Sequence, residues 1–340
     1  MRLCVGTAKG IVILDPDRGA TPRMVSADPP SVWCLAQDCA KPNLLYAGSI
    51  HNAQAGSARG KGALALSDDG GRSWRDITPG IARDEEVWAL AAAPDRSGEV
   101  FVGASNARLL RSEDAGRSFR ECLGFLKLPG RDRWTFPQPP HIPHVRSISF
   151  NPHDANTIYV GVEEGGAFRS RDRGRSFEPL SQNIYADIHC LAADRNDPHR
   201  LYATTGGGFY VSTTGGAAWT LLKGLGRPYV VPLLPLPGGI IYTAAAGGPP
   251  PTWSMDQIGA NALMYRSTDH GVSFTPIAQA DGNVYPTRGM VMRLIAQPGD
   301  ERILFGALSD GTVIRMDERD DTVAIVAEKL PPAFDLVALP

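Results

Sequence analysis

The sequence predicts an all-β fold, a seven-bladed β-propeller of four-stranded antiparallel blades. Three observations predict it: a repeated turn motif, a repeated strand motif, and a C-terminal strand that matches a gap in the first repeat. Hydrophobic residues make up 43% of the 340 residues and charged residues 21%, which suits one globular domain over residues 1–340. Gly (37) and Pro (28) are slightly enriched, which favours many tight turns in a β-rich chain.

The turn motif is Ser-x-Asp-x-Gly-x-Ser/Thr-aromatic, or a near variant of it. It occurs five times, at 67–74, 112–119, 170–177, 212–219 and 267–274. The Asp side chain can accept hydrogen bonds from backbone N–H groups of its own turn, and the Gly permits a positive φ. Each copy therefore predicts a hairpin whose aromatic residue re-enters the core as the next strand begins.

The strand motif is an apolar residue, Tyr or Phe, a second apolar residue, and Gly or Ala, with some substitutions. It occurs seven times, at 3–6, 45–48, 100–103, 158–161, 201–204, 241–244 and 303–306. A further apolar run precedes six of the copies, at 32–35, 87–90, 145–148, 188–191, 230–233 and 291–294. The first copy has no such run ahead of it.

The missing run stands at the other end of the chain, at 334–340. A ring of blades has open edges unless both ends of the chain complete one blade, so this run is predicted to be the innermost strand of the N-terminal blade. The other blades are predicted at 31–78, 86–122, 144–180, 187–222, 229–277 and 287–327. A six-bladed ring is the alternative, because the turns near 17–19 and 317–322 are degenerate.

Charge and sequence patterning exclude several classes of protein. The formal net charge of -2 provides no basic field for nucleic acid or an anionic membrane. There is no apolar run of about 18 residues and no signal-peptide pattern, so a cytoplasmic protein is expected. The five cysteines include no Cys-x-x-Cys pair, which fits reduced thiols. The alternative is a secreted protein whose leader has been removed.

The five turns resemble the BNR or Asp-box repeats of sialidase-like propellers, across essentially the whole chain. Such repeats also occur in xyloglucan-cleaving glycoside hydrolases, sortilin-type receptors and photosystem II assembly factors, so the resemblance implies the fold and leaves the function open. It also implies that the turns lie at the blade periphery, away from the ligand. The sialidase motif Phe/Tyr-Arg-Ile-Pro is absent, since neither Arg2 nor Arg146 is followed by Ile-Pro. A true sialidase is therefore not expected.

Propellers bind ligands at the mouth of the central channel, where loops enter the innermost strands or follow the second strands. Two of these loops, 49–61 and 245–261, are longer than a hairpin requires, which is typical of functional loops. Polar residues of this face are the candidate catalytic residues: His144, His189, Glu163, Glu164, Arg146 and Asp187. Candidate substrate-binding residues are Tyr229, Trp253, Arg288 and Trp134.

Imidazoles beside carboxylates suit either a divalent metal ion or general acid–base chemistry. A divalent metal ion is the candidate cofactor, with His51, His141, His144 and His189 as candidate ligands. The alternative is that these histidines only hydrogen-bond loop backbone. Cys190 is expected to be a core thiol, with a nucleophilic role beside His189 as the alternative. Trp33 and Trp88 are expected to pack between blades.

These residues predict a small-molecule site at the channel mouth. The leading hypothesis is a metal-assisted hydrolase or lyase that acts on a small polar, anionic or glycoside-like substrate. A two-carboxylate glycoside hydrolase is included, because Asp187, Glu163 and Glu164 could flank one bond. The alternative is a non-catalytic scaffold that binds a protein partner through its loop face.

Overall fold

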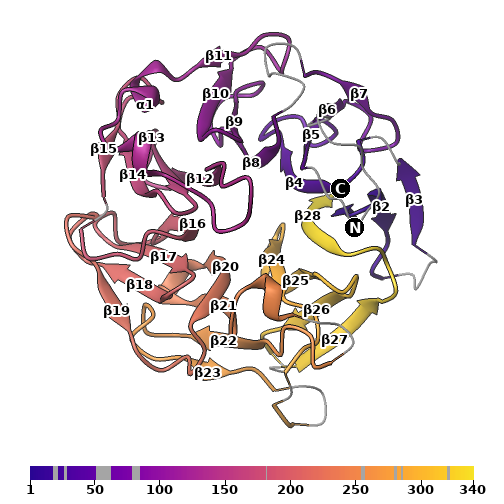
Figure 1. The fold of residues 1–340 in the computed structure, drawn as a ribbon. Coiled ribbons are helices and arrows are strands. Elements are labelled where there is room, and N and C mark those ends of the chain that lie inside the picture. Colours follow the sequence, from indigo (N-terminus) through magenta and orange to yellow (C-terminus); the bar gives the residue numbers. More distant parts are fainter. Residues whose placement is uncertain are drawn as a thin grey trace.

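The computed structural model describes residues 1–17, 22–26, 29–50, 63–78, 85–180, 182–253, 257–278, 282–284, 286–319 and 322–340. Seven sheets of four antiparallel strands follow one another around a ring (Figure 1). The seven-bladed prediction is confirmed, and the six-bladed alternative is wrong. No helix within these ranges is of the length and apolar character that a membrane crossing requires.

We number the blades 1 to 7 from the N-terminus. Blade 1 holds β28 (Ala333–Leu339), β1 (Arg2–Thr7), β2 (Gly10–Leu14) and β3 (Arg23–Ser26). Blade 2 holds β4 (Val32–Gln37), β5 (Leu45–Ser49), β6 (Leu64–Ser67) and β7 (Arg75–Asp76). Blade 3 holds β8 (Val87–Ala92), β9 (Val100–Ala104), β10 (Arg108–Ser112) and β11 (Arg120–Glu121). Blade 4 holds β12 (Val145–Asn151), β13 (Asp154–Val162), β14 (Gly166–Ser170) and β15 (Glu178–Pro179).

The remaining blades follow the same pattern. Blade 5 holds β16 (Ile188–Ala193), β17 (Leu201–Thr205), β18 (Gly208–Ser212) and β19 (Thr220–Leu222). Blade 6 holds β20 (Tyr229–Pro235), β21 (Ile241–Ala246), β22 (Leu263–Ser267) and β23 (Thr275–Pro276). Blade 7 holds β24 (Val291–Gln297), β25 (Asp300–Leu308), β26 (Val313–Asp317) and β27 (Thr322–Ala327). Short helical turns lie outside the sheets: α1 (Leu123–Leu126), η2 (Arg131–Arg133), η3 (Pro237–Gly239) and η4 (Pro250–Thr252).

Both ends of the chain complete blade 1, as predicted. Strand β28 pairs antiparallel with β1, with Cys4 opposite Val337, and the two termini lie side by side in Figure 1. Asp335 also ties β28 to the neighbouring blade, because its Oδ2 accepts a hydrogen bond of 2.7 Å from the backbone N–H of Leu35 in β4. The last strand therefore connects blades 1 and 2.

The glycine of the strand motif has a packing role. A Cβ added at Gly48 would stand 2.4 Å from Cγ1 of Val87, at the start of the innermost strand of the next blade. Only glycine leaves room for this approach. The same close approach recurs at Gly6, Gly103 and Gly161. The glycine of the repeated strand motif thus lies where one blade packs against the next.

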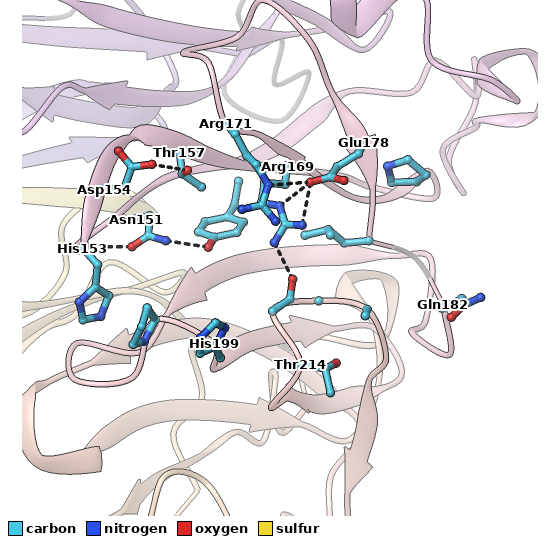
Figure 2. Close-up of a pocket in the computed structure, with 17 residues that line it drawn as sticks. Asn151, His153, Asp154, Thr157, Arg169, Arg171, Glu178, Gln182, His199 and Thr214 are labelled. Atoms are coloured by element: carbon cyan, nitrogen blue, oxygen red, sulfur yellow. Dashed lines mark hydrogen bonds and ion pairs between the residues drawn. The ribbon is translucent and has the colours of Figure 1, made fainter.

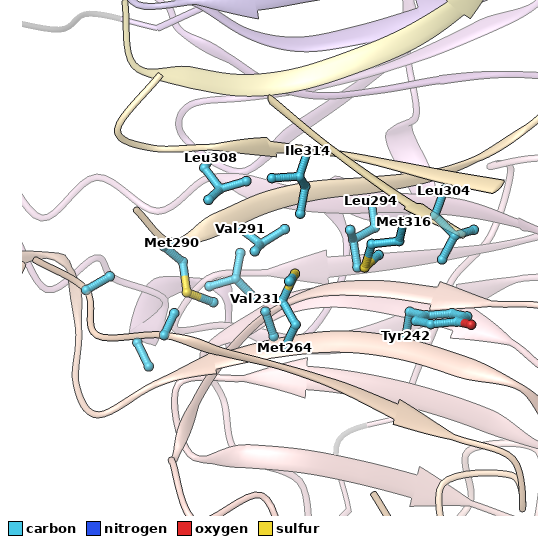
Figure 3. Close-up of a cluster of buried hydrophobic side chains, with 14 of the residues drawn as sticks. Val231, Tyr242, Met264, Met290, Val291, Leu294, Leu304, Leu308, Ile314 and Met316 are labelled. Carbon is cyan, nitrogen blue, oxygen red and sulfur yellow. The ribbon is translucent and has the colours of Figure 1, made fainter. Parts of the chain in front are cut away.

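The hydrophobic core lies between adjacent blades. In the cluster shown in Figure 3, Tyr242 and Met264 of blade 6 pack with Leu294, Leu304 and Ile314 of blade 7. All five side chains are buried. Because each sheet buries one face against the preceding blade and the other against the following one, the strands are apolar on both faces. This explains the near-continuous apolar runs of the sequence.

The repeat turns have a shared hydrogen-bond pattern. In turn 112–119, the Ser112 hydroxyl donates to Asp114 and accepts from the backbone N–H of Gly116, while Asp114 Oδ1 accepts from the backbone N–H of Ser118. The Ser118 hydroxyl donates to the other oxygen of Asp114 at 2.6 Å, and these bonds lower the pKa of Asp114 to about 2. In turn 212–219, Thr214 takes the place of the Asp and accepts from the backbone N–H of Ala218.

We predict that Asp114→Ala lowers the free energy of unfolding by about 1–2 kcal/mol, because several hydrogen bonds of the turn are lost. Thr214→Ala is the matched control and should cost less, since a neutral hydroxyl is removed in place of a carboxylate. The pKa of Asp114 is lowered from its ordinary 3.8, so its contribution is present above about pH 4 and is lost as the pH falls towards 2. Urea unfolding at pH 7 and pH 2.5 measures both effects. An unchanged difference between wild type and Asp114→Ala at the two pH values would contradict this account.

We also predict that Val337→Cys forms a disulfide with Cys4 under mild oxidation. The two positions are opposite each other in the β1–β28 pair, and both side chains belong to one apolar cluster. Opposed residues of antiparallel strands are about 4.5–5.5 Å apart at Cα, which a disulfide can span. Mass spectrometry and faster migration on a non-reducing gel would detect the crosslink. The experiment is done with Cys39→Ser, since Cys39 is an exposed thiol.

Leu336→Cys is the matched control, because Leu336 lies opposite Val5 and not Cys4. Equal or stronger crosslinking by Leu336→Cys would show that the ring does not close in this register.

Candidate functional site at the channel mouth

A β-bulge interrupts every innermost strand close to its first residue. The residues left out of the ladder register are Trp33, Trp88, Arg146, His189, Val231 with Pro232, Met292 and Phe334. A bulge redirects the side chain of the extra residue and is frequent next to functional sites. These residues occupy equivalent positions in the seven blades, and we call them the bulge ring. The strand patterns of the sequence did not predict it.

One arc of the bulge ring is aromatic. The rings of Phe334 and Trp33 have centroids 4.7 Å apart, and Trp33 and Trp88 meet edge to face at 5.2 Å. Trp88 in turn stacks on His144 at 3.7 Å. The expectation that Trp33 and Trp88 pack between blades is confirmed, because these contacts join blades 1, 2, 3 and 4. The three bulge residues are only half-buried, so part of each ring stays accessible.

The next member of the ring, Arg146, joins the aromatic arc to a polar cluster. Its guanidinium lies 4.7 Å from the ring centroid of Trp33, and its Nε is 3.3 Å from Oε2 of Glu163. His144 Nε2 lies 2.9 Å from the same oxygen. Burial by itself would raise the pKa of Glu163, but His144 and Arg146 outweigh it and lower the pKa. Glu163 is therefore held as a buried carboxylate.

His189 is the bulge residue of blade 5. Its Nδ1 is 2.6 Å from the backbone carbonyl oxygen of Val230, and its Nε2 is 3.4 Å from Oδ1 of Asp187. Neither His189 Nε2 nor Asp187 Oδ1 has a hydrogen-bond partner in the described part of the chain, although both atoms are buried. Ligand atoms of Glu163, Asp187 and His189 all lie within 4.8 Å of one another.

Two backbone features hold this cluster together. The backbone N–H of Gly166 donates to the carbonyl of Ala186 at 3.0 Å, which joins the turn after β13 to the loop that enters β16. A Cβ on Gly206 would stand 2.2 Å from Asp187 Oδ2, so the carboxylate occupies space that only glycine leaves. Residues 163 and 187 are thus placed by contacts between blades 4 and 5.

The structure brings five of the six candidate catalytic residues into direct contact or close approach: His144, Arg146, Glu163, Asp187 and His189. The sixth, Glu164, is half-buried beside them. Burial raises its pKa, and the charges of Asp187 and Glu163 raise it further. Their catalytic role stays a prediction.

The candidate substrate-binding residues are placed differently from one another. The ring of Tyr229 is buried 4.5 Å from that of His189 and 5.7 Å from that of Trp253. Trp134 is half-buried and packs on Phe168 and under Arg131. Arg288 is exposed, and its backbone carbonyl accepts from the N–H of Ala260. Of these four, Tyr229 has contacts with the polar cluster.

The predicted set of metal ligands needs correction. His141 is exposed, with its Nδ1 2.8 Å from the carbonyl oxygen of Phe136, and Nε2 of His144 is taken by Glu163. His51 lies outside the described residues. Within those residues, the one group whose ligand atoms converge is Glu163, Asp187 and His189. The group that could hold a metal ion therefore consists of two carboxylates and one of the predicted histidines.

Cys190 is half-buried, so the expectation of a fully buried core thiol is not met. Burial raises its pKa, which disfavours the thiolate that a nucleophile requires. The nucleophilic alternative is not supported by this environment.

A groove of about 840 Å³ lies away from the mouth, between blades 4 and 5 (Figure 2). It is lined at the far end of β12 by residues such as Asn151, His153 and His199. Within it, Glu178 accepts hydrogen bonds from both Arg169 and Arg171. The groove is large, but its described lining residues include none of the buried polar atoms without a hydrogen-bond partner that are found at the mouth.

No family model matches the chain. It is similar to the oligoxyloglucan-reducing end-specific xyloglucanase of Emericella nidulans, with 25% identity over 159 residues, which are 38% of this chain and 18% of that protein. It is also similar to a xyloglucanase of Hypocrea jecorina, with 22% identity over 244 residues, which are 59% of this chain and 27% of that protein. The chain spans only about a quarter or less of the length of these relatives.

Solved structures share the fold at low sequence identity. A GH74 enzyme of Niastella koreensis superposes with a TM-score of 0.70 at 18% identity, covering 95% of this chain and 51% of that one. YCF48 from Cyanidioschyzon merolae superposes with a TM-score of 0.60 at 16% identity, covering 90% of this chain and 89% of that one. A structure of YCF48 bound to D1 peptide is also similar, with a TM-score of 0.56. These likenesses show a propeller fold.

Proposed function

We propose that the channel mouth is the carbohydrate-binding site of a glycoside-hydrolase-like protein. The observation that carries this proposal is the bulge ring, in which the aromatic arc of Phe334, Trp33 and Trp88 passes directly into Arg146 and the buried carboxylates. The similarity of the chain to xyloglucanases supports the same class of ligand.

The chemistry of the mouth suits a sugar. The accessible parts of these half-buried aromatic rings offer apolar surface against which a pyranose ring can pack, with little loss of side-chain freedom. Arg146 and the carboxylates at its other side offer donors and acceptors for hydroxyl groups. A few polar groups that converge beside an aromatic wall are typical of small-molecule sites.

The turn geometry supports assignment of the repeats to the Asp-box class. The Asp side chain of the motif receives hydrogen bonds from its own turn at Asp69, Asp114, Asp172 and Asp269. These turns belong to the hairpins that lead to the outermost strands. The repeats would then build the scaffold and leave the mouth to bind the ligand.

Glu163 is poorly placed to act as the free carboxylate of a two-carboxylate mechanism. Its Oε2 lies 2.9 Å from His144 Nε2 and 3.3 Å from Arg146 Nε, and these contacts engage the carboxylate. Of the three carboxylates that could flank a glycosidic bond, Asp187 and Glu164 are therefore the better candidates for the acid–base pair.

Peptide binding is the second candidate function. The chain aligns with nearly the full length of YCF48, and a YCF48 structure holds a D1 peptide. A propeller of matching size could present the same mouth to an extended peptide.

We predict that xyloglucan oligosaccharides bind to the protein and that Trp33→Leu weakens this binding about tenfold, because a stacking surface is lost. Isothermal titration calorimetry measures both affinities. Trp74→Leu is the matched control, since Trp74 is a half-buried tryptophan in a repeat turn, outside the bulge ring. Equal oligosaccharide affinity in wild type and Trp33→Leu would show that the saccharide does not bind against Trp33 at the mouth. Binding of peptides with no binding of oligosaccharides would favour the second candidate.

A further inference from the structure

We propose that Glu163, Asp187 and His189 bind a divalent transition-metal ion, for which Zn²⁺ is the best fit. The site goes beyond the proposed carbohydrate function, because it stands on the geometry of these three side chains and not on the identity of a substrate. All three are more than nine-tenths buried, with exposed fractions of 7%, 6% and 2%.

The tautomer of His189 is the first step of the argument. A backbone carbonyl can only accept, so the 2.6 Å contact between Nδ1 and the Val230 oxygen requires that Nδ1 carries the proton. In the neutral ring, Nε2 is then a bare lone pair, and it faces the carboxylate of Asp187. Two buried acceptors that face each other repel unless something electropositive lies between them.

A metal-ligating histidine usually has this arrangement. Its second ring nitrogen donates to a backbone carbonyl or a carboxylate, which fixes the ring orientation and raises its basicity. Val230, the residue before the bulge of blade 6, supplies that carbonyl.

The distances fit a small ion. Two ligand atoms that are each about 2.1 Å from a tetrahedral Zn²⁺ stand about 3.4 Å from each other. His189 Nε2 and Asp187 Oδ1 are 3.4 Å apart and make no hydrogen bond to each other. A metal ion needs only the convergence of the lone pairs.

Glu163 supplies the third ligand, and two neighbouring side chains hold its carboxylate in position. Its Oε2 receives His144 Nε2 and Arg146 Nε, and these contacts orient the carboxylate. One of its carboxylate oxygens lies within 4.8 Å of the ligand atoms of Asp187 and His189. Mixed imidazole and carboxylate donors favour Zn²⁺ over Ca²⁺ or Mg²⁺, which prefer all-oxygen sites. Three protein ligands leave a fourth position open to water or substrate, as in catalytic zinc sites.

Zinc titration of tag-free protein, first dialysed against chelator and then freed of it, tests the proposal. We expect one Zn²⁺ per chain by calorimetry and elemental analysis, and a thermal unfolding midpoint that rises with added Zn²⁺. His189→Gln should abolish stoichiometric binding, because it removes the one nitrogen ligand. His153→Gln is the matched control, since that histidine lines the distant groove and should bind Zn²⁺ as wild type does.

Two further variants separate ligation from folding. His144→Phe keeps an aromatic ring against Trp88 but removes the contact to Glu163, and it should weaken Zn²⁺ binding about tenfold to hundredfold. Gly206→Ala should weaken binding as well, because its Cβ would displace the Asp187 carboxylate. Far-ultraviolet circular dichroism confirms that each variant is folded.

Absence of stoichiometric Zn²⁺ from wild type, or wild-type affinity in folded His189→Gln, would overturn the proposal. Mn²⁺ binding at the same residues with no Zn²⁺ binding would overturn the choice of metal. Oligosaccharide affinity measured in the presence of chelator tests the proposed function separately, so either proposal can fail without the other.

Discussion

Pairing of β1 with β28 sets the geometry on which the channel mouth depends. Because the ring closes through this pair, the seven innermost strands must surround one axis at a fixed spacing, and β28 takes the place next to β4. Asp335 reinforces that place by accepting the backbone N–H of Leu35, and it lies 3.2 Å from Arg293 of β24 on the other side. Three successive blades are thus joined at the residue that follows the bulge of β28.

The β-bulges of the innermost strands redirect the side chains that form the candidate site. Without them, the second residue of each innermost strand would follow the regular alternation of the strand and pair across the ladder. With them, Trp33, Trp88, Arg146 and His189 make contacts to neighbouring blades near the start of their strands. Val230, directly before the bulge of blade 6, provides the carbonyl that fixes the His189 ring. Packing between blades and chemistry at the mouth therefore use the same residues.

The fold could be predicted because its signals are local and repeated. Glycines such as Gly48 and Gly161 mark close contacts between blades, and the unmatched run at 334–340 required a partner at the N-terminus. The positions of the repeated strands in the sequence also predicted that His144, Glu163 and His189 lie on one face of the ring. The proposed ligand set could not be predicted from the sequence, because it depends on contacts between distant residues. The Val230 carbonyl selects the tautomer of His189, and the carboxylate of Glu163 contacts Nε2 of His144. His141 is near His144 in sequence, yet it turns to the carbonyl of Phe136.

The central claim is that the closed ring brings donors from blades 4 and 5 to a single point at the channel mouth. Anomalous X-ray diffraction at the zinc absorption edge, on crystals soaked in Zn²⁺, measures this directly. The account predicts one strong peak about 2 Å from ligand atoms of Glu163, Asp187 and His189. A peak at exposed histidines such as His141 with none at this cluster would contradict it.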